Sequence, residues 1–88
     1  MSSKISYTAS AICAHHGVNK EILSDMVYWG VATPYGETSD RWIFSQSDYE
    51  RIACASRFVN DYDLNIAGSA MVLDLLQELD KVRIEIKG

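Results

Sequence analysis

The sequence predicts a mainly helical fold, a winged helix–turn–helix of about four helices with a short strand pair or wing. Two helical stretches near the N-terminus are separated by only three residues, 17–19, which is typical of a helix–turn–helix. Residues 32–45 lack helical periodicity, and two further helical stretches follow them. Because a chain of 88 residues has room for one core, we expect a single domain over residues 1–88.

The first predicted elements are an edge strand and a helix. Residues 5–7 (Ile-Ser-Tyr) alternate between apolar and polar side chains, as an edge strand does. Thr8 is a suitable N-cap for a helix that runs from Ala9 to about His16. Gly17 is expected to end this helix, because glycine readily adopts the left-handed conformation that closes a helix.

The second predicted helix covers residues 20–29, with Asn19 as its N-cap and Gly30 at its end. Its apolar side chains gather on one face, as in a helix packed on a core: Ile22, Leu23, Met26 and Val27. The two helices together therefore form the predicted helix–turn–helix.

Residues 32–45 are expected to form a loop followed by a strand, which together make the wing. Residues 33–36 (Thr-Pro-Tyr-Gly) are a turn signal, and residues 42–44 (Trp-Ile-Phe) favour a β-strand. We expect this strand to pair with residues 5–7. Its two aromatic residues are expected to belong to the core or the strand rather than to a binding surface.

A third helix is expected to begin at a capping box, in which Ser47 and Glu50 satisfy free backbone groups at the helix start. This helix runs to about Asp61. Its inward face is predicted from spacings of three and four residues: Ile52, Ala55, Val59 and Tyr62.

A fourth helix is expected to start after Asn65 and to extend toward Ile84. Its apolar residues repeat at heptad spacing: Gly68, Val72, Leu75, Leu79, Val82 and Ile86. Leu73 and Leu76 widen this stripe into a broader apolar surface. Two interpretations stay open: the stripe packs on the core of its own chain, or it forms a seam for a partner helix or a homodimer.

No constellation of residues indicates an enzyme, so no catalytic, cofactor-binding or metal-binding residue is predicted. His15 and His16 are adjacent and would point about 100° apart on a helix, so they cannot share a metal ion. Cys13 and Cys54 fit no metal-binding spacing and are expected to be reduced, small apolar core residues. No apolar run approaches the roughly 18 residues of a membrane span, and no signal peptide is visible, so we expect a cytoplasmic protein.

The charge of the chain argues against a free DNA-binding domain. The net charge is −4 and the isoelectric point is about 4.9, and the eight basic residues are scattered. DNA-binding domains of this size usually carry a basic stripe, because neutralising phosphates supplies much of their affinity. The acidic balance makes DNA unlikely as a partner and favours a basic protein.

The order of strand, helix–turn–helix, wing and two helices resembles the MerR family. In its DNA-binding members, an arginine and a tyrosine usually follow the buried leucine of the second helix. If Leu23 is that leucine, Ser24 and Asp25 stand in their place. Residues 40–44 (Asp-Arg-Trp-Ile-Phe) replace the usual glycine-tyrosine-arginine sequence of the wing, and an aspartate that faces a phosphate weakens binding.

With these differences from the DNA-binding members, the chain resembles the CbpM chaperone-modulator family, whose fold is MerR-like. Its members bind the J-domain of a DnaJ-type co-chaperone, CbpA, and inhibit its action with DnaK and on DNA. The resemblance therefore implies a J-domain partner, and because J-domains present a basic helix to DnaK, an acidic surface would compete for it. Three stretches carry the resemblance: acidic Glu21 and Asp25 followed by residues 30–31 and Pro34; residues 42–44; and residues 64–68 leading into residues 72–76.

The candidate partner-binding residues are Glu21, Asp25, Tyr28 and Trp29, an acidic and aromatic patch on the second helix. Glu21 and Asp25 lie four residues apart and so share one face. Competing interpretations are that Glu21 only complements the positive end of the helix and that Trp29 belongs to the core.

Two other functional hypotheses stay open. A MerR-like DNA-binding transcriptional regulator is supported by the fold and by Arg41, Arg51 and Arg57. A structural homodimer through the last helix could coexist with either function. Asp74 and Glu78 form a second acidic pair, for which a solvated outer face is the simplest explanation.

Overall fold

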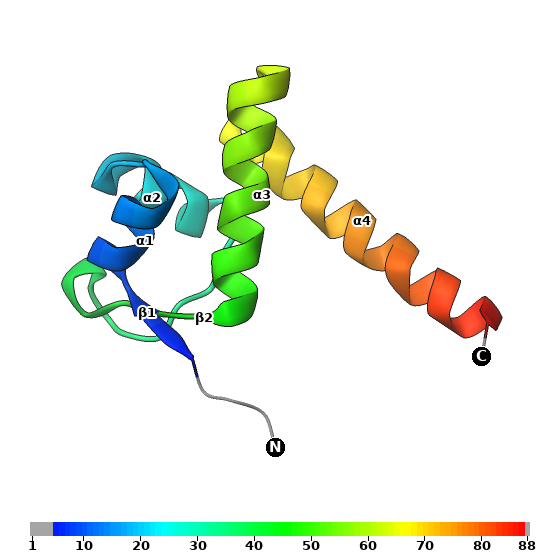
Figure 1. Cartoon of the computed structure of the whole chain (residues 1–88), viewed down its shortest axis with the longest axis horizontal. Helices are drawn as coiled ribbons and strands as arrows, with labels where there is room; N and C mark the ends of the chain where they lie inside the picture. The colour runs from blue at the N-terminus through cyan, green and yellow to red at the C-terminus, as the bar shows by residue number, and fades with distance from the viewer. Residues whose placement is uncertain (1–4, 88) are drawn as a thin grey trace.

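The computed structural model describes the backbone of residues 5–87 and the side chains of residues 5–81. Within this range, four α-helices and a two-stranded sheet form the mainly helical fold with a short strand pair that the sequence predicts. Helix α3 stands in the middle, with α1, α2 and the sheet on one side and α4 running away on the other (Figure 1). The elements are β1 (Ser6–Thr8), α1 (Ala9–His16), α2 (Lys20–Tyr28), the 3₁₀ turn η1 (Ser39–Arg41), β2 (Ile43–Ser45), α3 (Gln46–Tyr62) and α4 (Ile66–Lys87).

The helix–turn–helix forms as predicted, because its ends are fixed by local hydrogen bonds. The Thr8 hydroxyl accepts a hydrogen bond from the N–H of Ala11 at the start of α1. Gly17 ends α1 in the left-handed conformation, with a φ of 65°. The Asn19 side chain then accepts from the N–H of Ile22 at 2.8 Å and begins α2.

The wing strand pairs with the N-terminal strand, as expected, but each strand lies one residue later than predicted. The antiparallel register places Tyr7 opposite Phe44 and Thr8 opposite Ile43. Phe44 is fully buried, which is why it takes the centre of the strand rather than its end. Trp42 is partly buried against the core, so neither aromatic residue of the wing is a free surface contact.

Helix α3 begins two residues earlier than predicted, and the capping box at residues 47–50 is wrong. Ser45 and Asp48 form the box instead: the Ser45 hydroxyl accepts from the N–H of Asp48, and the carboxylate of Asp48 accepts from the N–H of Ser45. Asp48 also accepts from the N–H of Thr33 at 3.2 Å and is buried. This long-range bond to the wing loop selects Asp48 over the exposed Glu50.

The inward face of α3 is predicted correctly at Ile52 and Ala55, which are fully buried. Tyr62 is exposed, contrary to the prediction, and Phe58 packs against the core one turn earlier. The reason is that the last turn of α3 extends past the neighbouring helices (Figure 1).

Helix α4 packs on the core through a narrower face than the predicted heptad stripe. Ser69, Ala70 and Leu73 are buried, whereas Leu75 and Leu79 are 60% and 57% exposed. The small Ser69 and Ala70 allow close contact with the core near the start of α4, after which the helix diverges from α3 (Figure 1). Core packing therefore does not explain the heptad stripe; its last members, at positions 82 and 86, lie outside the described side chains.

The core lies between the helix–turn–helix, the wing strand, α3 and the start of α4. Its buried apolar residues are Ile12, Leu23, Met26, Val31, Ala32, Phe44, Ile52, Ala55, Ala70 and Leu73. Both cysteines are free: Cys13 is half-buried against the core, but Cys54 is exposed, so its prediction as a core residue is wrong. Among the described residues, no helix has the length and apolarity to cross a bilayer.

Candidate partner-binding site

The four predicted partner-binding residues are all exposed on or beside α2. Glu21 lies in the first turn, and Asp25 one turn later on the same face. Tyr28 is 78% exposed and Trp29, the residue that follows the last turn, is 52% exposed. The two aromatic rings meet edge to face, with their centroids 5.1 Å apart. Trp29 is therefore a surface residue, which contradicts its interpretation as core.

Asp25 and Trp29 also line a groove of about 450 Å³ on the side of α2 that faces α4. The other walls come from the last turn of α3 and from the start of α4: Val59, Asn65, Ile66 and Ala67. Asn65 holds the start of α4, because its side-chain oxygen accepts from the N–H of Gly68 at 2.6 Å. We call this cavity the α2–α4 groove.

Sequence reasoning did not select the α3 and α4 residues of the groove. They are 30 or more positions from Trp29 in the chain, and only the packing of α2 against α4 brings them together. One signal was present, since residues 64–68 are part of the stretch that most resembles the CbpM family.

The negative charge of α2 is not neutralised within the described part of the chain. Neither Glu21 nor Asp25 forms an ion pair with any side chain that the structure describes. The last turn of α2 contains no basic residue either. A cationic partner would therefore meet free carboxylates on this face.

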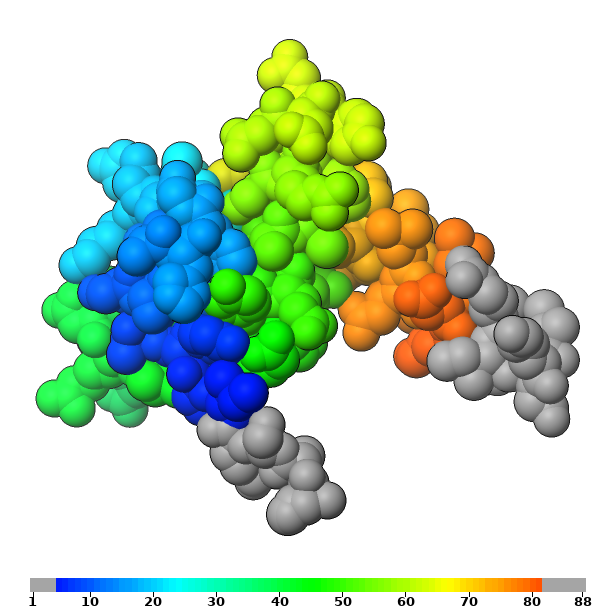
Figure 2. All heavy atoms as spheres, in the orientation of Figure 1, coloured from blue at the N-terminus to red at the C-terminus, as the bar shows by residue number. Residues whose placement is uncertain are grey.

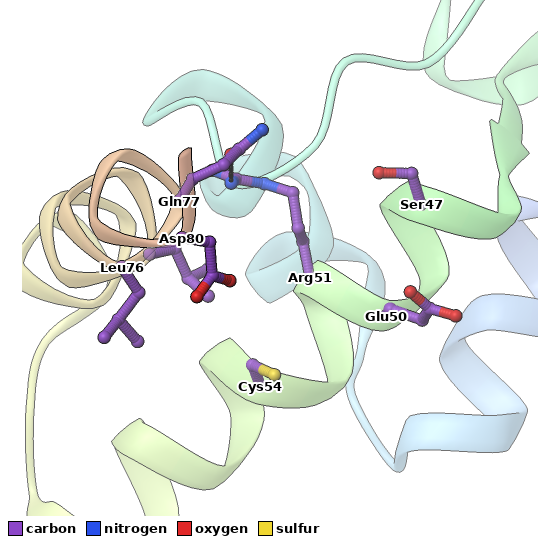
Figure 3. Close-up of a pocket in the computed structure, with 8 residues that line it drawn as sticks. Ser47, Glu50, Arg51, Cys54, Leu76, Gln77 and Asp80 are labelled. Atoms are coloured by element: carbon purple, nitrogen blue, oxygen red, sulfur yellow. Dashed lines mark hydrogen bonds between the residues drawn. The ribbon is translucent and has the colours of Figure 1, made fainter. Parts of the chain in front are cut away.

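Arg51 is a structural residue and not a free cation. Its Nε donates to the carbonyl of Val31 at 2.6 Å, and its Nη2 donates to the carbonyl of Gly30 and to the Asp74 carboxylate, 2.9 Å away. Its Nη1 donates to the side-chain oxygen of Gln77 (Figure 3). Arg51 thus joins the loop after α2, α3 and α4, and one of the three arginines that favoured DNA binding is engaged. Asp74 is likewise paired and not simply a solvated acid.

A second groove, of about 350 Å³, lies between α3 and α4 beside Arg51. Figure 2 shows the surface hollowed there, between α3 in green and α4 in orange. Its walls include Cys54 and Glu50 from α3 and Leu76 from α4 (Figure 3). Leu76 also belongs to a set of exposed apolar residues on α4, which we call the apolar row: Met71, Leu75, Leu76 and Leu79.

The histidines belong to an aromatic cluster on the other side of α3. Tyr7 stacks on Tyr49 with ring centroids 4.4 Å apart, and His16 lies 4.4 Å from the same Tyr49 ring. Burial, and to a smaller extent the charge of His15, lowers the pKa of His16 below its usual value. Among the described residues, no three potential metal ligands gather at one place.

Comparison with known proteins adds a family to this geometry. Residues 7–88 match the family described as MerR HTH family regulatory protein. The chaperone modulatory protein CbpM of Citrobacter koseri is 32% identical over 81 residues, which cover 92% of this chain and 80% of that protein. The protein of the same name from Salmonella arizonae is 31% identical over the same shares of the two chains.

Proposed function

This chain belongs to the MerR HTH regulatory protein family and is a CbpM-like chaperone modulatory protein, and from this premise we propose that it binds the J-domain of a CbpA/DnaJ-type co-chaperone and inhibits its co-chaperone activity. A chain with this role is a regulator and not an enzyme. The two free cysteines are consistent with work in the reducing cytoplasm.

One observation carries the proposal: the second helix of the helix–turn–helix has acidic side chains on the face where a DNA-binding relative needs basic ones. Glu21 and Asp25 are exposed on α2, one turn apart and without an ion-pair partner among the described side chains. Phosphates would be repelled by this face, whereas a basic helix would be attracted to it. Complementary charge mainly accelerates association and selects the partner.

Aromatic side chains next to these acids supply the apolar contact that charge alone does not. Tyr28 and Trp29 are exposed and adjoin Asp25 on the same end of α2. Exposed tyrosine and tryptophan are the residues that most often dominate the free energy of protein–protein binding. The patch therefore combines carboxylates that attract a cation with aromatic side chains that supply apolar contact. A competitor for a basic helix requires both.

Calorimetric titration with a purified CbpA-type J-domain tests the proposal. We expect a Kd in the micromolar range or tighter and inhibition of the ATPase stimulation that the J-domain gives to DnaK. The double variant Glu21→Lys and Asp25→Lys should weaken binding by about tenfold or more. Absence of binding at about 100 μM J-domain, a free energy near −5.5 kcal/mol, would contradict the proposal.

A single charge reversal elsewhere, compared with Asp25→Lys alone, separates the α2 face from net charge, because each of these two variants changes the charge by +2. Glu37 is exposed in the loop before the wing strand, so a variant with Glu37→Lys changes the charge outside α2. We expect this variant to bind the J-domain almost as the unmodified chain does. A gel shift with duplex DNA at low salt tests the alternative, and sequence-selective retardation would favour a DNA-binding regulator.

A second proposal concerns self-association through α4. The apolar row of Met71, Leu75, Leu76 and Leu79 is exposed on a helix that diverges from the core, and such a face favours pairing with a second copy. Sedimentation should show a dimer that Leu75→Glu dissociates and that Glu78→Ala, at an exposed position, leaves intact. A monomer at about 100 μM would exclude this pairing.

A further inference from the structure

The α2–α4 groove combines an apolar floor with an acidic rim. Trp29 is half-exposed at its edge, and Val59, Ile66 and Ala67 line it while remaining partly accessible. Its volume, about 450 Å³, lies in the lower part of the range found for ligand pockets. The groove therefore suits one or two inserted side chains and is too small to enclose a helix.

The groove is negative because Asp25 lines it close to the C-terminus of α2, where an acid opposes the helix dipole. The C-terminus of a helix carries a partial negative charge, so a basic residue is favoured in its last turn and an acidic one costs stability. Helix α2 has Asp25 in its last turn, and the last turn of α3, from which Val59 lines the groove, contains Asp61. Neither helix has a basic residue in its last turn.

Asp25 is not explained by contacts within the described chain. It forms no ion pair with a described side chain, although it lies near the negative end of its own helix. Local choices that cost stability and lack internal compensation are typical of functional surfaces. The missing compensation here is a positive charge at the mouth of the groove.

We propose that the α2–α4 groove receives a single long cationic side chain of the partner, an arginine in preference to a lysine. This inference rests on the proposed function and names the residue class that the site recognises. The aliphatic stem of the side chain packs on Val59 and Ile66, and the planar guanidinium stacks on the Trp29 indole. Its charge lies beside Asp25 and the negative ends of α2 and α3.

Other side chains fit this groove less well. A leucine or methionine would cover the apolar floor but would bring apolar atoms against the Asp25 carboxylate without supplying a hydrogen-bond donor. A carboxylate would be repelled by the rim. An arginine satisfies both parts, because its stem is apolar and its head is a cation with five donors.

A double-mutant cycle with the J-domain tests the assignment. Trp29→Ala and Asp25→Asn should each weaken J-domain binding by about tenfold, whereas the exposed controls Tyr35→Ala and Glu37→Gln should change it by less than about twofold. On the partner, one exposed arginine or lysine replaced by methionine should produce a loss that does not add to that of Trp29→Ala. Circular dichroism should confirm that each variant is folded.

The outcomes distinguish this inference from the proposed function. If the J-domain binds and the two groove variants behave like their controls, the groove assignment is wrong while the function stands. If the J-domain does not bind at all, a small probe still tests the groove: N-acetyl-arginine methylamide at millimolar concentration should shift the Trp29 indole N–H signal in NMR. Its neutral isostere N-acetyl-citrulline methylamide should shift that signal much less, and equal shifts would overturn the proposal.

Discussion

Replacing Arg51 by methionine tests whether one side chain holds α4 to the rest of the molecule. The substitution keeps the apolar stem and removes the guanidinium, which donates to the carbonyls of Val31 and Gly30, to Gln77 and to Asp74. The Arg51 side chain is 20% exposed, so its bonds to the two carbonyls are partly shielded from water.

The expected loss follows from the burial of each partner. Hydrogen bonds from a charged donor contribute about 1.5–3 kcal/mol, and the short bond to Val31 belongs to this class. The ion pair with Asp74 contributes at most about 1 kcal/mol, because the Asp74 side chain is 70% exposed and screened by solvent. We therefore expect Arg51→Met to lower the free energy of unfolding by about 3 kcal/mol, a large fraction of the stability of a small domain.

Urea denaturation followed by circular dichroism measures this loss. The control is Asp74→Asn, which removes only the solvent-exposed partner and should cost less than about 1 kcal/mol. The reasoning is refuted if Arg51→Met costs no more than Asp74→Asn, since the bonds to the backbone carbonyls would then contribute nothing. A large loss in both variants would refute it as well, because the exposed ion pair would have to dominate.

Two further predictions concern the wing loop and the aromatic cluster. Gly36→Ala should destabilise the fold by about 1–3 kcal/mol, because Gly36 has a φ of 115° and a Cβ there would lie 2.5 Å from the backbone oxygen of Arg41. Gly17→Ala, at a φ of 65° with open space around it, should cost less in the same urea titration, and the reverse order would contradict this account. Burial and the charge of His15 lower the pKa of His16 in the folded state, so stability should be retained above about pH 6.5 and lost as the pH falls below it. The variant His16→Leu should flatten this dependence of the urea midpoint on pH, and an unchanged dependence would show that another group titrates.

The helix–turn–helix was predictable because its determinants are local. Thr8 and Asn19 each cap a helix through a hydrogen bond to an N–H three residues away, so a short window of sequence contains both partners. The start of α3 was predicted two residues late because two serines are followed by an acid three positions on. The choice between them depends on Thr33, which lies 15 residues from Asp48 and is brought to it only by the fold.

The apolar face of α4 shows a second limit of pattern reading. A heptad stripe indicates that a face is apolar but not what covers it, and here the core takes the narrow face around Ser69 and Ala70. Leu75 and Leu79 are left exposed as a result.

The candidate site was predictable in part for the same reasons. Exposure of Glu21 and Asp25 followed from the charge pattern of α2, whereas the groove beside Trp29 depends on residues at the end of α3 and the start of α4. Arg51 illustrates the opposite error. Its charge suggested a nucleic-acid contact, but its geometry assigns it to the scaffold.

Because α4 diverges from α3, a small tilt at its start produces a large displacement at its other end. Its 22 residues span about 33 Å, so a tilt of about 10° at its base displaces its tip by about 6 Å. The base of this helix is a wall of the α2–α4 groove, and its middle turns carry the exposed apolar row. A side chain bound in the groove that tilts α4 therefore moves the apolar row, and by thermodynamic reciprocity, pairing through that row alters the affinity of the groove by the same factor.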